Sequence, residues 1–122
     1  MLIDSNIIIY SFSEEYGYLR KLLVSDNSHV SEISRVEVLG HHGLNEKQKD
    51  YFVDVFSYST VVIPTQEIFD KAIEIRQKYN LKLGDSIIAA TALVHNLTLY
   101  TRNLKDFERI KKMKYINQTT SR

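Results

Sequence analysis

The sequence predicts an α/β fold: a three-layer α/β/α sandwich with a central parallel sheet of four to five short strands. Short apolar or β-branched segments alternate with longer segments that have helical periodicity. The strands show hardly any hairpin signal, so helices must connect them, and helical connections produce a parallel sheet covered on both faces. With no internal repeat or linker, we expect residues 1–122 to form a single domain.

The first third of the chain begins with a short apolar strand at residues 2–3. Residues 4–6 then supply three good helix-capping side chains before the next apolar segment. A second amphipathic helix is expected at residues 18–24, and a brief strand at residues 29–31. The helix that follows, at residues 32–39, can be ended by the glycine after it.

The middle of the chain carries the clearest local signals. Residues 45–48 have the spacing of a capping box, and the helix after them has one apolar face through residues 51–56. Residues 60–63 form a β-branched strand stopped by Pro64. We expect Thr65 to cap the next helix, which runs to Tyr79.

The last third contains the apolar stretch from Leu81 to Val94, in which Asp85 opens a helix that is apolar nearly all round and is therefore expected to be buried. Residues 97–101 form another strand, residues 103–107 a short helical turn, and residues 115–116 a possible last strand. We expect Gly84 to free the turn before the buried helix. Asp85, in its first turn, can either cap the helix or bind a metal ion.

The composition limits the possible chemistry. The chain has no cysteine, which excludes disulfides, thiol nucleophiles and Cys-based zinc sites and fits a reducing compartment. Any metal must therefore be held by oxygen or imidazole. No apolar segment is as long as a membrane span and the N-terminus has no basic export signal, so we expect a cytoplasmic protein without membrane contact.

The charges are unevenly distributed along the chain. Residues 1–101 hold 9 Lys/Arg and 13 Asp/Glu, a net charge of −4, whereas residues 102–122 hold 7 and 2, a net charge of +5. This basic segment is a candidate surface for phosphate groups, although charges near a terminus are more often simply solvated.

Four acidic residues stand out by their context: Asp4 after a strand, Glu37 among apolar residues, Asp85 at the start of the buried helix and Asp106 in the turn after another strand. Each has an ordinary explanation as a cap, a solvated residue or half of an ion pair. In parallel sheets, however, sites form beyond the carboxyl ends of strands. If the four converge there, each close pair repels by about 4 kcal/mol at 4 Å and an effective dielectric of 20.

A hard divalent cation removes that repulsion, and oxygen ligands suit Mg²⁺ or Mn²⁺ better than zinc. Such an ion polarises a phosphoryl oxygen and lowers the pKa of a bound water, which is the chemistry of phosphodiester hydrolysis. There is no Gly-rich phosphate loop and no Gly-x-Ser-x-Gly elbow, so nucleotide-binding and acyl-transfer functions lose their main support.

Four segments in a characteristic order carry a family resemblance: Leu2 to Asn6, Ser34 to Leu39, Gly84 to Ala92, and Leu99 to Phe107. Together they resemble PIN-domain proteins of the VapC type, the ribonuclease toxins of bacterial and archaeal toxin–antitoxin pairs. The resemblance covers essentially the whole chain. It implies a parallel α/β/α sandwich, an acidic Mg²⁺ or Mn²⁺ site, endoribonuclease activity on RNA, a homodimer and an inhibitory antitoxin partner.

The resemblance also assigns roles to individual residues. The expected catalytic and metal-binding residues are the four acids Asp4, Glu37, Asp85 and Asp106. Polar residues expected to support them are Ser5, Asn6, Thr101 and Asn103. Ser5 stands where the family commonly has Thr, and relatives often have an acid at the position of Asn103, so which of Asn103 and Asp106 lies nearer the metal is open, as is the number of metals. Residues expected to contact the RNA backbone are Arg102, Lys105 and Lys112.

Two alternatives stay open at this stage. The first is a PIN-like RNA-binding or scaffold module that keeps the acids but does not cleave. The second is a structure-specific DNA nuclease that uses the same metal chemistry. Adjacent His41 and His42 point apart on a helix, so we interpret them as solvated residues and not as a metal site.

Overall fold

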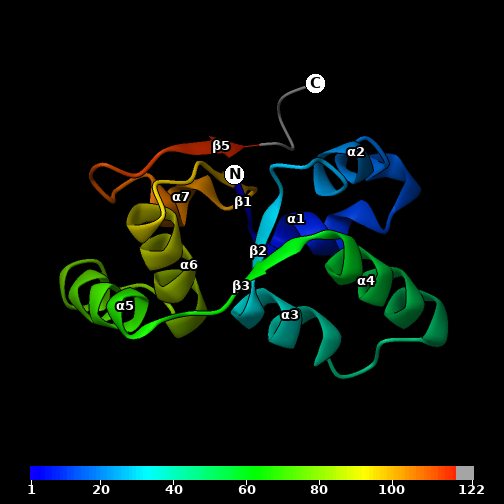
Figure 1. Cartoon of the computed structure of the whole chain (residues 1–122), viewed down its shortest axis with the longest axis horizontal. Helices are drawn as coiled ribbons and strands as arrows, with labels where there is room; N and C mark the ends of the chain where they lie inside the picture. The colour runs from blue at the N-terminus through cyan, green and yellow to red at the C-terminus, as the bar shows by residue number, and fades with distance from the viewer. Residues whose placement is uncertain (118–122) are drawn as a thin grey trace.

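A parallel five-stranded sheet lies at the centre of the computed structural model, which describes residues 1–117 (Figure 1). The strands are β1 (Leu2–Ile3), β2 (His29–Ser31), β3 (Thr60–Val62), β4 (Leu99–Thr101) and β5 (Tyr115–Asn117). They lie in the order β3-β2-β1-β4-β5, and every neighbouring pair is parallel. The predicted fold class is confirmed. Residues 118–122, the end of the predicted basic segment, lie outside the described part.

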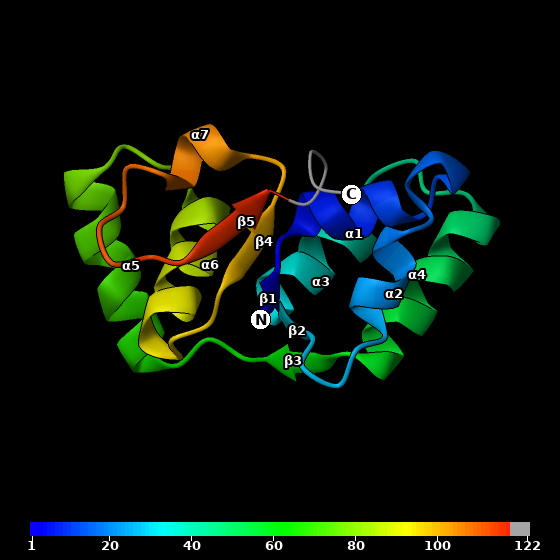
Figure 2. The ribbon, with the colours of Figure 1, turned by 90° about the horizontal axis from the view of Figure 1, so that it is seen from above.

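Helices cover both faces of this sheet (Figures 1 and 2). They are α1 (Ser5–Ser11), the short 3₁₀ helix η1 (Glu14–Tyr16), α2 (Leu19–Leu23), α3 (Glu32–Leu39), α4 (Glu46–Tyr58), α5 (Gln66–Lys78), α6 (Leu83–Val94) and α7 (Leu104–Phe107). Helices α1 to α4 pack on one face and α5 to α7 on the other. Successive strand side chains point to opposite faces of the sheet and so pack into two different hydrophobic cores. Leu2 packs with α5 and α6, whereas Ile3 packs with α1 to α4.

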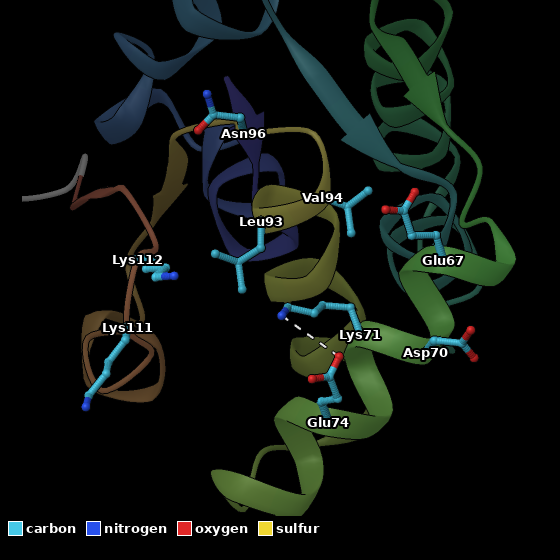
Figure 3. A pocket seen from close by; sticks show the side chains of 9 residues that line it. All are labelled: Glu67, Asp70, Lys71, Glu74, Leu93, Val94, Asn96, Lys111 and Lys112. Carbon is cyan, nitrogen blue, oxygen red and sulfur yellow. Dashed lines mark ion pairs between the residues drawn. The ribbon is translucent and has the colours of Figure 1, made fainter.

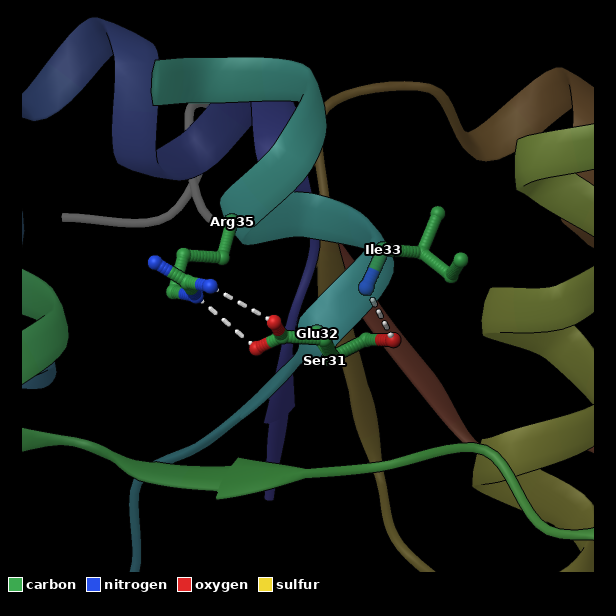
Figure 4. Close-up of polar contacts among 4 residues, drawn as sticks. All are labelled: Ser31, Glu32, Ile33 and Arg35. Carbon is green, nitrogen blue, oxygen red and sulfur yellow. Dashed lines mark hydrogen bonds and ion pairs between the residues drawn. The ribbon is translucent and has the colours of Figure 1, made fainter. Parts of the chain in front are cut away.

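Caps fix the starts of several helices. The capping box at Asn45 and Gln48 is present as predicted, and Thr65 caps α5. Ser31 caps α3 by accepting a hydrogen bond from the Ile33 amide (Figure 4). Ser31 ends β2 and Thr65 lies three residues after the end of β3, so these two caps set where α3 and α5 leave the sheet.

The strand order places a topological switch point between β1 and β4. From β1 the chain moves outward through β2 and β3, and it then returns to the other side of β1 to form β4 and β5. In a parallel sheet such a point leaves a crevice beyond the carboxyl ends of the two strands. Asp4 follows β1, and Thr101 ends β4. No helix within residues 1–117 is both long enough and apolar enough to cross a membrane.

Candidate active site

Asp4 lies at the switch point and is held from two sides. One carboxylate oxygen accepts a hydrogen bond from the Ser5 amide at 2.8 Å, which caps α1, and the other accepts one from the Thr101 hydroxyl at 2.8 Å. The residue is only 4% exposed. A buried carboxylate with both oxygens fixed is well placed to present its remaining lone pairs to a ligand.

Burial raises the pKa of Asp4 to about 6. The hydrogen bonds from Thr101 and Ser5 stabilise the charged form and lower this pKa, whereas the negative charges of Asp85 and Glu37 raise it. The Asp4 carboxylate therefore lies within electrostatic reach of one acid from α3 and one from α6.

Glu37 reaches the site from the last turn of α3. Its Oε1 accepts a hydrogen bond from the Ser5 hydroxyl at 2.7 Å, and that hydroxyl also lies 2.8 Å from the Ser34 hydroxyl. Ser5 thus holds Asp4 with its backbone and Glu37 with its side chain. Ser34 is fully buried and was missed by the sequence reasoning. Its only sequence signal was its place one turn before Glu37.

The first turn of α6 lies directly against Glu37. A side-chain carbon built on Gly84 would come within 2.8 Å of Glu37 Oε2. The helix begins at Leu83 with Lys82 at the N-cap, so Gly84 lies inside the helix. The expectation that it frees a preceding turn was wrong. A larger residue at this position would push the Glu37 carboxylate away from its observed place, so the glycine allows the close approach.

Asp85 occupies the first turn of α6 and is not its N-cap residue. Partial burial raises the pKa of Asp85, and the charges of Asp106 and Glu37 raise it further, whereas Lys82 lowers it. Asp85 therefore does not cap α6 with its side chain, although its carboxylate lies in the first turn, near the positive end of the helix dipole. Lys82 is a further cation beside the site that the sequence reasoning did not select.

The turn after β4 carries Asp106 to the same edge. The Thr101 hydroxyl, which donates to Asp4, accepts a hydrogen bond from the Asn103 amide at 2.8 Å, and the Asn103 side chain donates to Asp106 Oδ2. We expected Asn6 to orient Asp4. In the structure Asn6 Oδ1 instead accepts a hydrogen bond from the Arg102 backbone amide at 3.3 Å, which ties this turn to α1.

The four acids are close but not closed around a common point. Within residues 1–117, no three Asp, Glu or His side chains take an arrangement that could hold a metal ion. The ion pairs in that part of the chain join Arg35 to Glu32 (Figure 4) and Lys71 to Glu74 (Figure 3), so none neutralises the four acids.

The donor set nevertheless fits a hard cation. Carboxylate, hydroxyl and amide oxygens are the ligands that Mg²⁺ and Mn²⁺ prefer, and the mutual charge of the acids has no counter-ion among the ion pairs above. Glu37 is exposed and Asp85 and Asp106 are partly exposed, so their carboxylates can rotate. Closure on an ion therefore requires side-chain movement around a fixed Asp4.

The three predicted RNA contacts lie in different places. Lys105 is exposed on α7, next to Asp106. Lys112 lines a wide hollow of about 840 Å³ between α5, the end of α6 and the segment after α7 (Figure 3). None of the four acids Asp4, Glu37, Asp85 and Asp106 lines that hollow. Arg102 is partly buried against Tyr10, as described below.

Comparison with known proteins decides the family. The model of the PIN domain family matches residues 1–113. The chain belongs to the PIN domain family. The resemblance to PIN-domain proteins of the VapC type is thereby confirmed at the level of family and fold.

Relatives of this PIN domain include Ribonuclease VapC1 of Methanocaldococcus jannaschii, which is 28% identical over 91% of the chain and 81% of the relative. A solved toxin–antitoxin complex from Klebsiella pneumoniae contains a chain that is 32% identical, with a TM-score of 0.78 and 95% of each chain covered. VapBC-1 from nontypeable Haemophilus influenzae has a similar fold, at 24% identity, a TM-score of 0.79 and 97% coverage of each chain.

Proposed function

We propose that this PIN domain is a divalent-metal-dependent endoribonuclease that hydrolyses phosphodiester bonds of RNA, and that it is the toxin of a toxin–antitoxin pair. The observation that carries the proposal is the buried Asp4 carboxylate at the β1/β4 switch point, with the charges of Glu37 and Asp85 beside it. The similarity to Ribonuclease VapC1 and to a toxin–antitoxin complex supports it.

In this proposal the residues that hold one or two Mg²⁺ or Mn²⁺ ions are Asp4, Glu37, Asp85 and Asp106. A bound ion supplies Lewis-acid polarisation of the phosphate and a water of lowered pKa. The chain's own residues prepare the site. The Thr101 and Ser5 donors favour the ionised form of Asp4, Ser5 fixes Glu37, and Asn103 holds Asp106. Thr101 and Asn103 lie in one chain of hydrogen bonds, so the two carboxylates they hold are linked.

The cations Lys82 and Lys105 flank the acids at α6 and α7, and we propose that they attract the RNA backbone, with Lys112 as a more distant contact. Hydrolysis by water leaves 5′-phosphate and 3′-hydroxyl ends, whereas attack by the ribose 2′-hydroxyl leaves 2′,3′-cyclic phosphates. End-group mapping of the products separates the two, and cyclic phosphates would exclude hydrolysis by water.

The deciding experiment uses the purified protein, free of any antitoxin, with matched RNA and DNA substrates in Mn²⁺, in Mg²⁺ and in EDTA. Asp85→Asn is the matched inactive variant, since it removes one charge and keeps the size of the side chain. We expect metal-dependent cleavage of RNA that EDTA and the variant abolish. Metal binding without cleavage of either substrate would favour the scaffold alternative, and cleavage of DNA alone would favour a DNA nuclease.

We further propose that residues 1–122 act as one domain, as a homodimer, in the cytoplasm, and that a small antitoxin protein inhibits them. The solved complexes of relatives with antitoxins support this partner. Light scattering of the purified chain tests the dimer. Co-purification of the product of a neighbouring small reading frame, with loss of RNA cleavage on binding, tests the antitoxin.

A further inference from the structure

The Arg102 guanidinium lies over aromatic rings that come from a distant part of the chain. Its guanidinium carbon is 3.7 Å from the ring centre of Tyr10 in α1 and 5.3 Å from that of Tyr16 in η1. The two rings pack edge to face, with centroids 5.1 Å apart and an interplanar angle of 76°. A guanidinium over tyrosine faces is held by cation–π attraction as well as by packing.

This placement makes Arg102 a poor phosphate ligand. Its Nη1 is buried and has no acceptor within the described residues, and one face of the guanidinium is covered by Tyr10. Arg binds phosphate through two parallel N–H donors at the edge of an accessible fork. An N–H that is buried without a partner is unfavourable, so the stack with Tyr10 and Tyr16 must hold the side chain in place.

The same residue is fixed at its backbone. The Arg102 amide donates to Asn6, and Asn6 and Tyr10 lie four residues apart on one face of α1. Helix α1 therefore holds the backbone of Arg102 with one residue and its side chain with the next residue along that face.

The neighbours of Arg102 in sequence are the two residues that hold acids. Thr101 donates to Asp4, and Asn103 donates to Thr101 with its backbone and to Asp106 with its side chain. A displacement of Arg102 must therefore move both donors.

We propose that Arg102, packed over Tyr10 and beside Tyr16, is a positioning residue that sets the turn carrying Thr101 and Asn103, and that it does not contact RNA phosphates. The proposal rests on the proposed nuclease function for its kinetic consequence. It assigns a role to Tyr10 and Tyr16, and it replaces the contact with RNA that charge alone suggested for Arg102.

Kinetics of RNA cleavage distinguish the two roles. Arg102→Lys keeps the charge and loses the guanidinium that packs over Tyr10. We expect a fall in kcat of at least about tenfold, as for supporting residues of metal sites, with KM and the salt dependence of RNA binding changed less than twofold. Tyr10→Leu should reproduce this loss, whereas Tyr10→Phe should keep the parental kcat. In the double variant Arg102→Lys/Tyr10→Leu, kcat should be no lower than in either single variant, because both substitutions break the same contact. Arg109→Lys and Tyr58→Leu are the matched controls.

The opposite pattern would overturn the proposal. If Arg102 binds RNA, Arg102→Lys retains kcat, whereas Arg102→Met raises KM. Arg102→Met should then also reduce the slope of log K for RNA binding against log salt concentration by about one, the contribution of one phosphate contact. Equal losses in Tyr10→Phe and Tyr10→Leu would also exclude positioning by the stack, since Phe keeps the ring.

An NMR experiment tests the positioning even if the protein cleaves no RNA. Ring currents should shift the Arg102 side-chain protons in the parent and in Tyr10→Phe, and this shift should decrease in Tyr10→Leu, where only the more distant Tyr16 ring remains. The backbone amide signal of Asn103 should move in Tyr10→Leu and in Arg102→Lys but not in Tyr10→Phe. An Asn103 signal that is insensitive to both substitutions would refute the proposal, whereas absent cleavage with these shifts intact would refute only the nuclease function.

Discussion

Replacing Asp4 by Asn should stabilise the metal-free protein at neutral pH. Asp4 is 4% exposed, and burial raises the pKa of its carboxyl from 3.8 to about 6. A raised folded-state pKa means that the folded chain binds the proton more tightly than the unfolded chain. The stabilisation of the fold by the proton on Asp4 is complete below pH 3.8 and is lost as the pH rises through about 6.

The size of the effect follows from the pKa. A shift of about two units, at about 1.4 kcal/mol per unit, corresponds to about 3 kcal/mol. At pH 4 both side chains are neutral in the folded state, and the free energies of unfolding of parent and variant should agree within about 1 kcal/mol, the value of one altered hydrogen bond. At pH 7.5 the variant should be more stable by about 3 kcal/mol, a figure that already includes the repulsion of Asp4 by Asp85 and Glu37 because both charges contribute to the raised pKa.

Urea unfolding in EDTA, followed by far-UV circular dichroism from pH 4 to pH 8, measures this difference. Asp54→Asn, an exposed acid on α4, is the control and should show no comparable change. Added Mn²⁺ should stabilise the parent above pH 6 and stabilise Asp4→Asn much less. If the difference in free energy of unfolding between the parent and Asp4→Asn does not change with pH, burial does not raise the pKa of Asp4.

Three other substitutions test the remaining parts of the site. Thr101→Val removes the hydroxyl that donates to Asp4, so it should raise the pKa of that carboxyl and move the acidic limb of the pH–rate profile to higher pH, whereas Thr101→Ser should not. Gly84→Ala, within α6, should displace the Glu37 carboxylate and lower cleavage at least about tenfold in the same assay, although Ala is the better helix former by about 1 kcal/mol. Asp85→Asn should abolish cleavage without lowering the metal-free free energy of unfolding, because this residue is not the helix N-cap; clear destabilisation in urea would contradict that.

The sequence was sufficient for the elements whose signals are local. The capping box at Asn45, the β-branched strand before Pro64 and the cap at Thr65 each depend on residues within a few positions of one another. Alternation of strands and helices, with hardly any hairpin signal, then determined the parallel sheet. The placement of Asp4 and Thr101 at adjacent strand ends followed from this architecture.

Contacts between residues far apart in sequence could not be predicted in the same way. Gly84 was interpreted through its backbone freedom, because nothing near it in the sequence indicates that Glu37, 47 positions earlier, approaches its α-carbon. Arg102 was assigned by charge, and only the structure shows the tyrosine rings that cover it.

The buried position of Asp4 links the fold to the proposed chemistry. A carboxylate at the switch point must be desolvated to be fixed by Thr101 and Ser5, and the same desolvation moves its pKa to about 6. Near neutral pH, protonation of Asp4 and binding of a cation therefore compete for the same carboxylate. Since a proton neutralises only one carboxylate while a divalent ion can neutralise several, the charges of Glu37 and Asp85 favour the cation more strongly than they favour protonation of Asp4 alone. The convergence of acids that destabilises the metal-free fold is thus the property that would give the site its affinity for a metal ion.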